Sequence, residues 1–275
     1  LEEENTLYLV RHGSPLLLSY NDNNAIITSE QSGFQNLVNN YLVLENHDII
    51  KLSLVDNKIK FSNIMKNIDY KLKDICKTNN LNLESTGYSH WTLKEIYEQP
   101  DSIRRALSFG GRILSNYEVI LGGLNENVNF LKTIDNIILL GCGTSYHSGM
   151  IGMYYLKELC NFNNVQLFDG AEFELHDIPK NGISSFILIS QSGETKDLHR
   201  CLQIANENNI FTIGIINVID SLIAREVDCG CYLNAGREVG VASTKAFTSQ
   251  CLLLSLISIW FAQIHNININ KRKNL

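Results

Sequence analysis

The second half of the chain alternates short apolar runs with longer stretches of helical periodicity. The apolar runs are nearly continuous, as in strands buried on both faces, and they span residues 137–140, 165–168, 186–189, 211–216 and 229–233. Helices are predicted at residues 145–160, 171–176, 195–206, 221–226 and 243–264. Strands and helices that alternate with this spacing predict an α/β fold, a doubly wound parallel sheet with helices on both faces.

The N-terminal part of the chain has a different pattern. Three short apolar runs separated by turn-forming residues occupy residues 7–10, 16–18 and 25–28. They predict a small β-rich fragment over residues 1–55. Residues 56–90 are polar and weakly patterned, which indicates a linker with some helix at 64–76. The α/β domain with its helical lead-in is assigned to residues 91–265, and a polar tail to 266–275.

Two helices are predicted directly before the α/β pattern. Leu93, Ile96 and Tyr97 fall on one face of the first helix. Pro100 is expected to interrupt that helix, so that Asp101-Ser102 can cap the second one.

The longest uncharged stretch of the chain is residues 246–264. Its length approaches the ~20 residues that a bilayer crossing needs. It also carries six polar residues, Thr248, Ser249, Gln250, Ser255, Ser258 and Gln263. We therefore interpret it as a buried helix of a globular core and expect no membrane contact.

Composition narrows the class of protein. The chain has 275 residues, 44% of them hydrophobic, and 23 basic against 29 acidic residues give a net charge of -6. This apolar content excludes global disorder, and the missing basic excess argues against a nucleic-acid binder. The seven cysteines show neither C-x-x-C nor a Cys/His array, so no metal site is expected. Residues 1–4 are acidic where a secretory signal is basic, which favours a cytoplasmic location.

Two loops at the ends of predicted strands carry the candidate chemistry. Gly141–Ser145 follows the strand that ends at Leu140, and Ser190–Thr195 follows the strand that ends at Ile189. Ligands of an open parallel sheet bind beyond the carboxyl ends of its strands. Free N–H groups and hydroxyls at a helix start can hold a phosphate dianion without any basic side chain.

Residue type and spacing argue against other interpretations of these loops. Ser145 or Thr195 alone could be an ordinary helix N-cap, but two such loops on one sheet favour the phosphate interpretation. No Gly-x4-Gly-Lys-Ser/Thr run exists, which excludes a P-loop. Tyr146 stands where a dinucleotide fingerprint that starts at Gly141 and Gly143 needs glycine. No cofactor is therefore expected.

A third segment, residues 234–245, follows the last strand and precedes the long helix, so it should reach the same edge of the sheet. Glu238 or Lys245 could contact a ligand there. A solvated turn before a capped helix is the simpler interpretation of both charges.

The same loops carry a family resemblance. GCGTSYHSG, SQSGETK and NAGREVGVASTKAFTSQ together resemble the first sugar isomerase (SIS) half of the glutamine:fructose-6-phosphate amidotransferase, or glucosamine-6-phosphate synthase, family. Residues 90–107 are similar to the helical lead-in of that domain. Residues 7–54 resemble the C-terminal end of the family's glutaminase domain, with Arg11–Leu16 matching R-x-G-S-P-L. The resemblance implies an SIS-type sheet preceded by a β-rich fragment of an N-terminal-nucleophile glutaminase domain.

By this resemblance the expected ligand is fructose 6-phosphate or glucosamine 6-phosphate. The residues implied for the phosphate group are Ser145, Ser190, Gln191, Ser192 and Thr195. Thr144 should contact the sugar or line the pocket, and Cys142 and Gly143 complete the first loop of the substrate-binding set. Val241 and Ser243 would face the sugar body.

No catalytic residue is predicted in this chain. The family's glutaminase uses an N-terminal cysteine, whereas position 1 is Leu. Its isomerase base, Schiff-base lysine and ring-opening histidine lie in or after a second SIS half, which would begin beyond Leu275. Glu194 and Lys245 do not inherit those roles.

The resemblance implies part of a glutamine-fructose-6-phosphate transaminase (isomerizing) that makes glucosamine 6-phosphate. This chain would supply the sugar-phosphate-binding half and would be catalytically incomplete by itself. Glutamine, a second SIS half and a homodimer are the partners implied for the full enzyme. Two alternatives stay open: a non-catalytic sugar-phosphate-sensing SIS module, and a degenerate remnant whose loops are only structural.

Overall fold

The computed structural model describes residues 3–12, 16–29, 31–34, 37–67, 70–74, 85, 87–219 and 221–274. The chain divides into two compact units, Leu1–Thr86 and Gly87–Leu275, which are described separately. The predicted turn at 13–15, which includes part of the R-x-G-S-P-L match, and Cys76 lie outside the described residues.

A five-stranded parallel sheet forms the centre of the second unit. Its strands are β8 (Asn136–Gly141), β9 (Asn164–Asp169), β10 (Ser184–Ser190), β11 (Phe211–Ile216) and β12 (Cys229–Tyr232), in the order β12-β11-β10-β8-β9. Every neighbouring pair is parallel. The predicted α/β fold and its five strands are confirmed.

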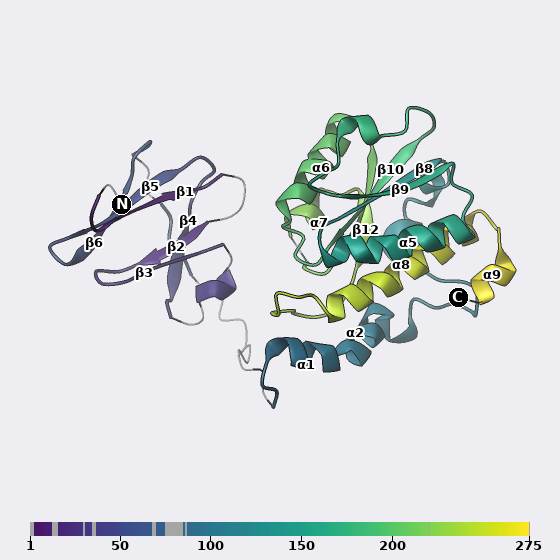
Figure 1. The fold of residues 1–275 in the computed structure, drawn as a ribbon, viewed down its shortest axis with the longest axis horizontal. Helices are drawn as coiled ribbons and strands as arrows, with labels where there is room; N and C mark the ends of the chain where they lie inside the picture. Colours follow the sequence, from purple (N-terminus) through teal and green to yellow (C-terminus); the bar gives the residue numbers. More distant parts are fainter. Residues whose placement is uncertain are drawn as a thin grey trace. The chain divides into compact units, whose positions relative to one another are not determined.

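Helices cover both faces of this sheet (Figure 1). One face carries α5 (Thr144–Leu159) and α8 (Lys245–Ile264), and the other carries α6 (Lys196–Glu207) and α7 (Leu222–Glu226). Alternate residues of a strand point to opposite faces, so Leu139 packs in the α5–α8 core and Leu140 in the α6–α7 core. The remaining helices of this unit are α1 (Trp91–Tyr97), α2 (Gln99–Ala106), α3 (Gly122–Asn125), α4 (Val128–Leu131), α9 (Ile269–Lys273) and the 3-10 turns η2 (Ser108–Gly110) and η3 (Leu175–Asp177).

Helix α8 is long and apolar enough to cross a membrane by length and composition alone. In this unit it packs instead into the core, where Leu253, Ile257, Trp260 and Phe261 are completely buried. The expectation that this stretch is a buried core helix is confirmed.

Two helix predictions were wrong in detail. Helix α2 begins at Gln99 and includes Pro100 in its first turn. Backbone N–H groups in the first turn of a helix have no intrahelical acceptor, so the N–H that Pro100 lacks costs the helix no hydrogen bond. Residues 171–176 form no α-helix. There the Asp169 carboxylate accepts the N–H of Ala171 at 3.0 Å, Phe173 is completely buried, and only the short turn η3 follows.

The first unit consists of two antiparallel sheets, as expected of a small β-rich fragment. One sheet has the order β1-β5-β6 and the other β3-β2-β4-β7. Their strands are β1 (Thr6–Val10), β2 (Leu17–Tyr20), β3 (Ala25–Thr28), β4 (Asn40–Val43), β5 (Ile49–Val55), β6 (Lys58–Asn63) and β7 (Lys73–Asp74), with the 3-10 turn η1 (Gln31–Phe34). Leu9, Leu18, Leu42, Leu44, Ile50 and Leu52 form the apolar core.

Strand β6 corrects the prediction of a linker at residues 56–90. Ile59 and Phe61 pack on the core while Lys58, Lys60 and Ser62 are exposed, which is the alternation of a half-buried strand. Lys58, Lys60 and Ser62 alternate with these two apolar residues and give the segment its polar composition. No helix is found in the described part of residues 64–76.

A buried carboxylate anchors the end of β6 in this unit. Asp48 is completely buried and accepts hydrogen bonds from Tyr70 Oη at 2.6 Å, the Glu45 N–H at 2.6 Å and Asn63 Nδ2 at 3.1 Å. Burial raises the pKa of Asp48, but these bonds and the charge of Lys66 outweigh it, so the pKa lies below the ordinary value of 3.8.

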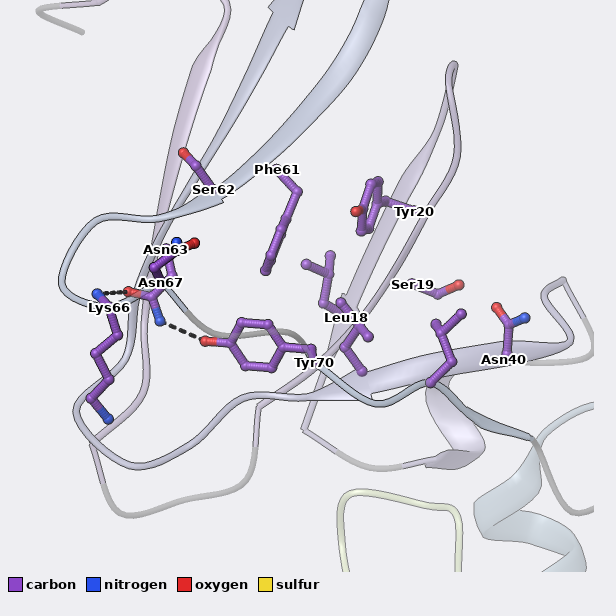
Figure 2. A pocket seen from close by; sticks show the side chains of 12 residues that line it. Leu18, Ser19, Tyr20, Asn40, Phe61, Ser62, Asn63, Lys66, Asn67 and Tyr70 are labelled. Carbon is purple, nitrogen blue, oxygen red and sulfur yellow. Dashed lines mark hydrogen bonds between the residues drawn. The ribbon is translucent and has the colours of Figure 1, made fainter.

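The same cluster borders a cavity of about 600 Å³ (Figure 2). Asn63 points toward Tyr70, and the Lys66 N–H donates to Asn63 Oδ1 at 3.1 Å. The cavity contains none of the residues predicted to bind substrate.

The stability that Asp48 contributes should depend on pH. Its folded-state pKa is lowered, so the contribution is complete above the ordinary carboxyl pKa and is lost as pH falls through the folded value.

Tyr70→Phe removes one hydrogen-bond donor to Asp48 and should accelerate amide exchange in β5 and β6 at pH 6. Tyr20→Phe is the control, because Tyr20 lines the same cavity and its hydroxyl has no partner among the described residues. Equal exchange in both variants would contradict the role assigned to Tyr70.

A close approach between α3 and β12 gives a test of the second unit. A methyl group on Gly123 would lie 2.1 Å from the carbonyl oxygen of Gly230, whereas one on Gly122 would meet nothing within 4 Å. Gly123→Ala should destabilise the unit by about 1–3 kcal/mol, and Gly122→Ala should be neutral or slightly stabilising. Urea unfolding followed by tryptophan fluorescence measures both, since Trp91 and Trp260 belong to this unit and Trp260 donates to Asn125 of α3 at 2.6 Å. Equal stability of the two variants would show that the backbone yields at Gly123.

Candidate functional site

The two candidate loops leave neighbouring strands at the same edge of the sheet. Strands β8 and β10 pair in parallel, and Ile189 lies opposite Gly141. Residues 142–145 and 191–195 therefore both emerge at the carboxyl end. Helix α5 begins within the first segment, at Thr144, and α6 begins directly after the second, at Lys196.

Ser145 is held by a side chain of the long helix α8. Gln250 Nε2 donates to Ser145 Oγ at 2.9 Å, and Gln250 Oε1 accepts from Ser148 Oγ at 3.1 Å. Ser145 does not cap α5, because Gly143 occupies the N-cap position and Thr144 is the first helical residue. The ordinary N-cap interpretation therefore does not account for Ser145.

In the second loop, Thr195 occupies the N-cap position of α6 but makes no side-chain cap bond. Its Oγ1 lies 3.2 Å from Ser190 Oγ, which also accepts the N–H of Gly193 at 2.9 Å. Gly193 has a φ of +67°, and a side chain there would collide with the hydroxyl of Ser221, so this turn requires glycine. Thr195 is therefore the N-cap by position, but its hydroxyl faces Ser190 and makes no capping bond.

The remaining residues of this loop support its shape. Ser192 Oγ accepts the N–H of Glu194 at 3.1 Å, and Gln191 is half-buried beside it. Glu194 Oε1 accepts the N–H of Leu222 at the start of α7 at 2.9 Å. Its carboxylate is therefore engaged in the fold.

These hydroxyls suit a ligand that only accepts hydrogen bonds. The Ser145 oxygen accepts from Gln250, and its own proton has no acceptor among the described residues. One of Ser190 and Thr195 donates to the other, which leaves one proton of the pair for a ligand. A phosphate dianion accepts such protons together with the free N–H groups at the starts of α5 and α6.

Cys142 belongs to the first loop, and its side chain lies beside Gly170, which follows β9, and the start of α6. A methyl group placed on Gly170 would lie 3.1 Å from Cys142 Sγ and 3.5 Å from the carbonyl carbon of Asp197 in α6. Both residues therefore lie close to Gly170. Burial, with the charge of Asp169, raises the pKa of the Cys142 thiol to about 11. The thiol is therefore neutral at pH 7 and does not repel an anion.

The third segment lies against the lead-in helices. Lys245 is buried and pairs with Glu98 at 2.5 Å, so it is not part of a solvated turn. Glu238 accepts from Ser243 Oγ at 2.8 Å and from the N–H of Thr244 at 2.9 Å at the start of α8. Val241 is fully exposed. Among the described residues, no hydrogen bond joins Val241 or Ser243 to the other two loops.

No group of three or more His, Cys, Asp or Glu side chains suited to a metal ion is found in the part of the chain that the structure describes.

Comparison with known proteins identifies this arrangement. Residues 130–259 match the SIS domain family. A probable glutamine–fructose-6-phosphate aminotransferase (isomerizing) of Acanthamoeba polyphaga mimivirus is 42% identical over 255 residues, which are 92% of this chain and 41% of the relative. The corresponding aminotransferase of Chlorobaculum tepidum is 33% identical over 94% of this chain and 41% of its own length.

A solved structure agrees with these relatives. The C-terminal domain of glucosamine-fructose-6-phosphate aminotransferase from Francisella tularensis superposes with a TM-score of 0.62 and 31% identity, over 70% of this chain and 53% of that one. Over 92% of its length the chain is similar to glutamine–fructose-6-phosphate aminotransferases, and it contains a match to the SIS domain family. It spans about two fifths of the length of the curated relatives it matches.

The SIS match covers every residue predicted to bind substrate, from Cys142 to Ser243. Their roles remain predictions at this point. The structure adds one residue that sequence reasoning did not single out as functional, Gln250, which holds Ser145 and Ser148. Its signal in the sequence is an amide side chain within the mostly apolar stretch 246–264.

Two glutamines of α8 allow a matched test of this contact. Gln250→Met removes the donor to Ser145, and Gln263→Met removes the acceptor of the Val119 N–H at 2.8 Å. Each should lower the free energy of unfolding by about 1–3 kcal/mol. Only Gln250→Met should also weaken the binding of inorganic phosphate, measured by titration calorimetry. Equal phosphate affinities in the two variants would separate Gln250 from the site.

Proposed function

We propose that this chain supplies the sugar-phosphate-binding SIS half of a glutamine–fructose-6-phosphate aminotransferase that makes glucosamine 6-phosphate. The ligand is fructose 6-phosphate or its amino product. The observation that carries the proposal is the pair of hydroxyl-bearing turns on the adjacent strands β8 and β10, each followed directly by a helix.

The phosphate group lies between the two turns in this proposal. Ser145, Ser190, Gln191, Ser192 and Thr195 surround it, and its charge is stabilised by the N-terminal N–H groups of α5 and α6. Thr144, Cys142 and Gly143 line the first loop beside it. Val241 and Ser243 face the sugar body. All ten residues lie within the SIS match, which supports this assignment.

The bound phosphate group contributes to catalysis because it positions the rest of the substrate. Glutamine is hydrolysed to glutamate and ammonia, the ammonia condenses with the ketose, and a proton moves between C1 and C2 to give glucosamine 6-phosphate. Binding energy from the remote phosphate holds those carbons where the reacting groups are. Those groups, which are not assigned to this chain, belong to the glutaminase and to a second SIS half.

The whole enzyme is proposed to be a homodimer in the cytoplasm. The six described cysteines are free thiols, which agrees with a reducing compartment.

Removing one hydroxyl should weaken sugar-phosphate binding by the whole chain. Ser190→Ala and Thr195→Ala should each raise the dissociation constant of fructose 6-phosphate about tenfold, because a hydrogen bond to a charged group contributes about 1.5–3 kcal/mol. Thr133→Ala is the matched control, since Thr133 is exposed just before the opposite end of β8. Calorimetry gives the three dissociation constants.

The proposal fails if the folded wild-type chain does not bind fructose 6-phosphate. It also fails if Thr133→Ala weakens binding as much as Thr195→Ala does. Binding that instead changes the affinity for a protein partner, with no role in turnover of a complete enzyme, would favour the sensing module.

A further inference from the structure

The lead-in helix α1 buries a carboxylate and exposes its apolar residues. Glu95 is its one buried side chain, at 1% exposure, whereas Leu93, Ile96 and Tyr97, predicted to share a face, are all exposed. A buried charge is costly unless hydrogen bonds compensate it. The hydrogen-bond partners of Glu95 therefore identify the segment that α1 holds in place.

Those contacts are backbone N–H groups of the third segment. Glu95 Oε1 accepts the N–H of Val239 at 2.6 Å and that of Gly240 at 3.1 Å, and Oε2 lies 3.2 Å from the Gly240 nitrogen. Among the described residues Glu95 has no ion-pair partner, so these dipoles compensate its charge.

Close packing accompanies these bonds. A methyl group on Gly240 would lie 2.7 Å from Glu95 Oε2 and 3.0 Å from Thr92 Oγ1. A side chain at position 240 would have to displace the Glu95 carboxylate, so glycine suits this close contact.

Both sides of one exposed turn are held in this way. Glu95 holds residues 239 and 240 before it, and Glu238 holds Ser243 and Thr244 after it. Between them Val241 is fully exposed and Ala242 is exposed as well. Two carboxylates therefore hold this turn, Glu238 from the turn's own segment and Glu95 from the lead-in helix α1.

We propose that Glu95 is a positioning residue for the sugar: it holds the 239–243 turn so that Val241 and Ser243 meet the sugar body. The inference rests on the proposed function, because it presumes a sugar phosphate in the site. The inference assigns phosphate binding and sugar positioning to different parts of the site. The turns at 142–145 and 190–195 hold the phosphate, while α1 acts only through the turn that contacts the sugar.

Two ligands separate these roles in the whole chain. Glu95→Ala should raise the dissociation constant of fructose 6-phosphate about tenfold and leave that of inorganic phosphate within about twofold. Glu95→Gln keeps one acceptor oxygen and should show a smaller loss of the same kind. Asp101→Asn, which removes an exposed lead-in carboxylate 3.4 Å from Arg104, should change neither constant.

Hydrogen exchange in the wild-type chain gives a measurement that does not depend on the folding of a variant, and Glu95→Gln adds a comparison. The amides of Val239 and Gly240 should be protected in the wild-type chain, and Glu95→Gln should make them exchange faster. Rapid exchange of both amides in the wild type would overturn the proposal.

The binding results also have distinct meanings. Equal losses for fructose 6-phosphate and phosphate, or no loss for either, would overturn the role of Glu95 alone. A wild-type chain that binds neither ligand would overturn the proposed function and, with it, this inference.

Discussion

Parallel pairing of β8 with β10 is the constraint on which the candidate site depends. Because the strands run in the same direction with Ile189 opposite Gly141, the loops that follow them must emerge at one edge. Helix α5 then turns onto one face of the sheet and α6 onto the other. Two helix N-termini therefore converge from opposite faces on the same edge, where their dipoles favour an anion without a basic side chain.

Buried polar side chains connect this edge to the surrounding helices. Gln250 reaches Ser145 from α8, Lys245 pairs with Glu98, and Glu95 holds Val239 and Gly240. A buried polar group is costly unless its partners are in place. These contacts therefore restrict where α8 and the lead-in can sit, and they make the lead-in part of the site's structure.

Sequence patterns predicted the regular parts of this fold well and the polar parts less well. The five strands of the second unit were recognisable because a strand buried on both faces is a continuous apolar run. The composition of strand β6 is typical of a linker because only Ile59 and Phe61 pack on the core of its unit. Pro100 was placed at a helix end because its effect depends on the position in the turn, which the helix start at Gln99 decides.

The sequence by itself determined the α/β class, the strand order along the chain and the two loops rich in glycine and hydroxyl groups. These follow from local periodicity and from residue chemistry at strand ends. Only the tertiary structure decided that Thr195 pairs with Ser190, that Gln250 holds Ser145 and that Glu95 is buried. Each contact joins a side chain to a partner whose position the packing of the chain sets, and Gln250 and Ser145 are far apart in sequence. Spacing along the chain carries no direct record of such distances.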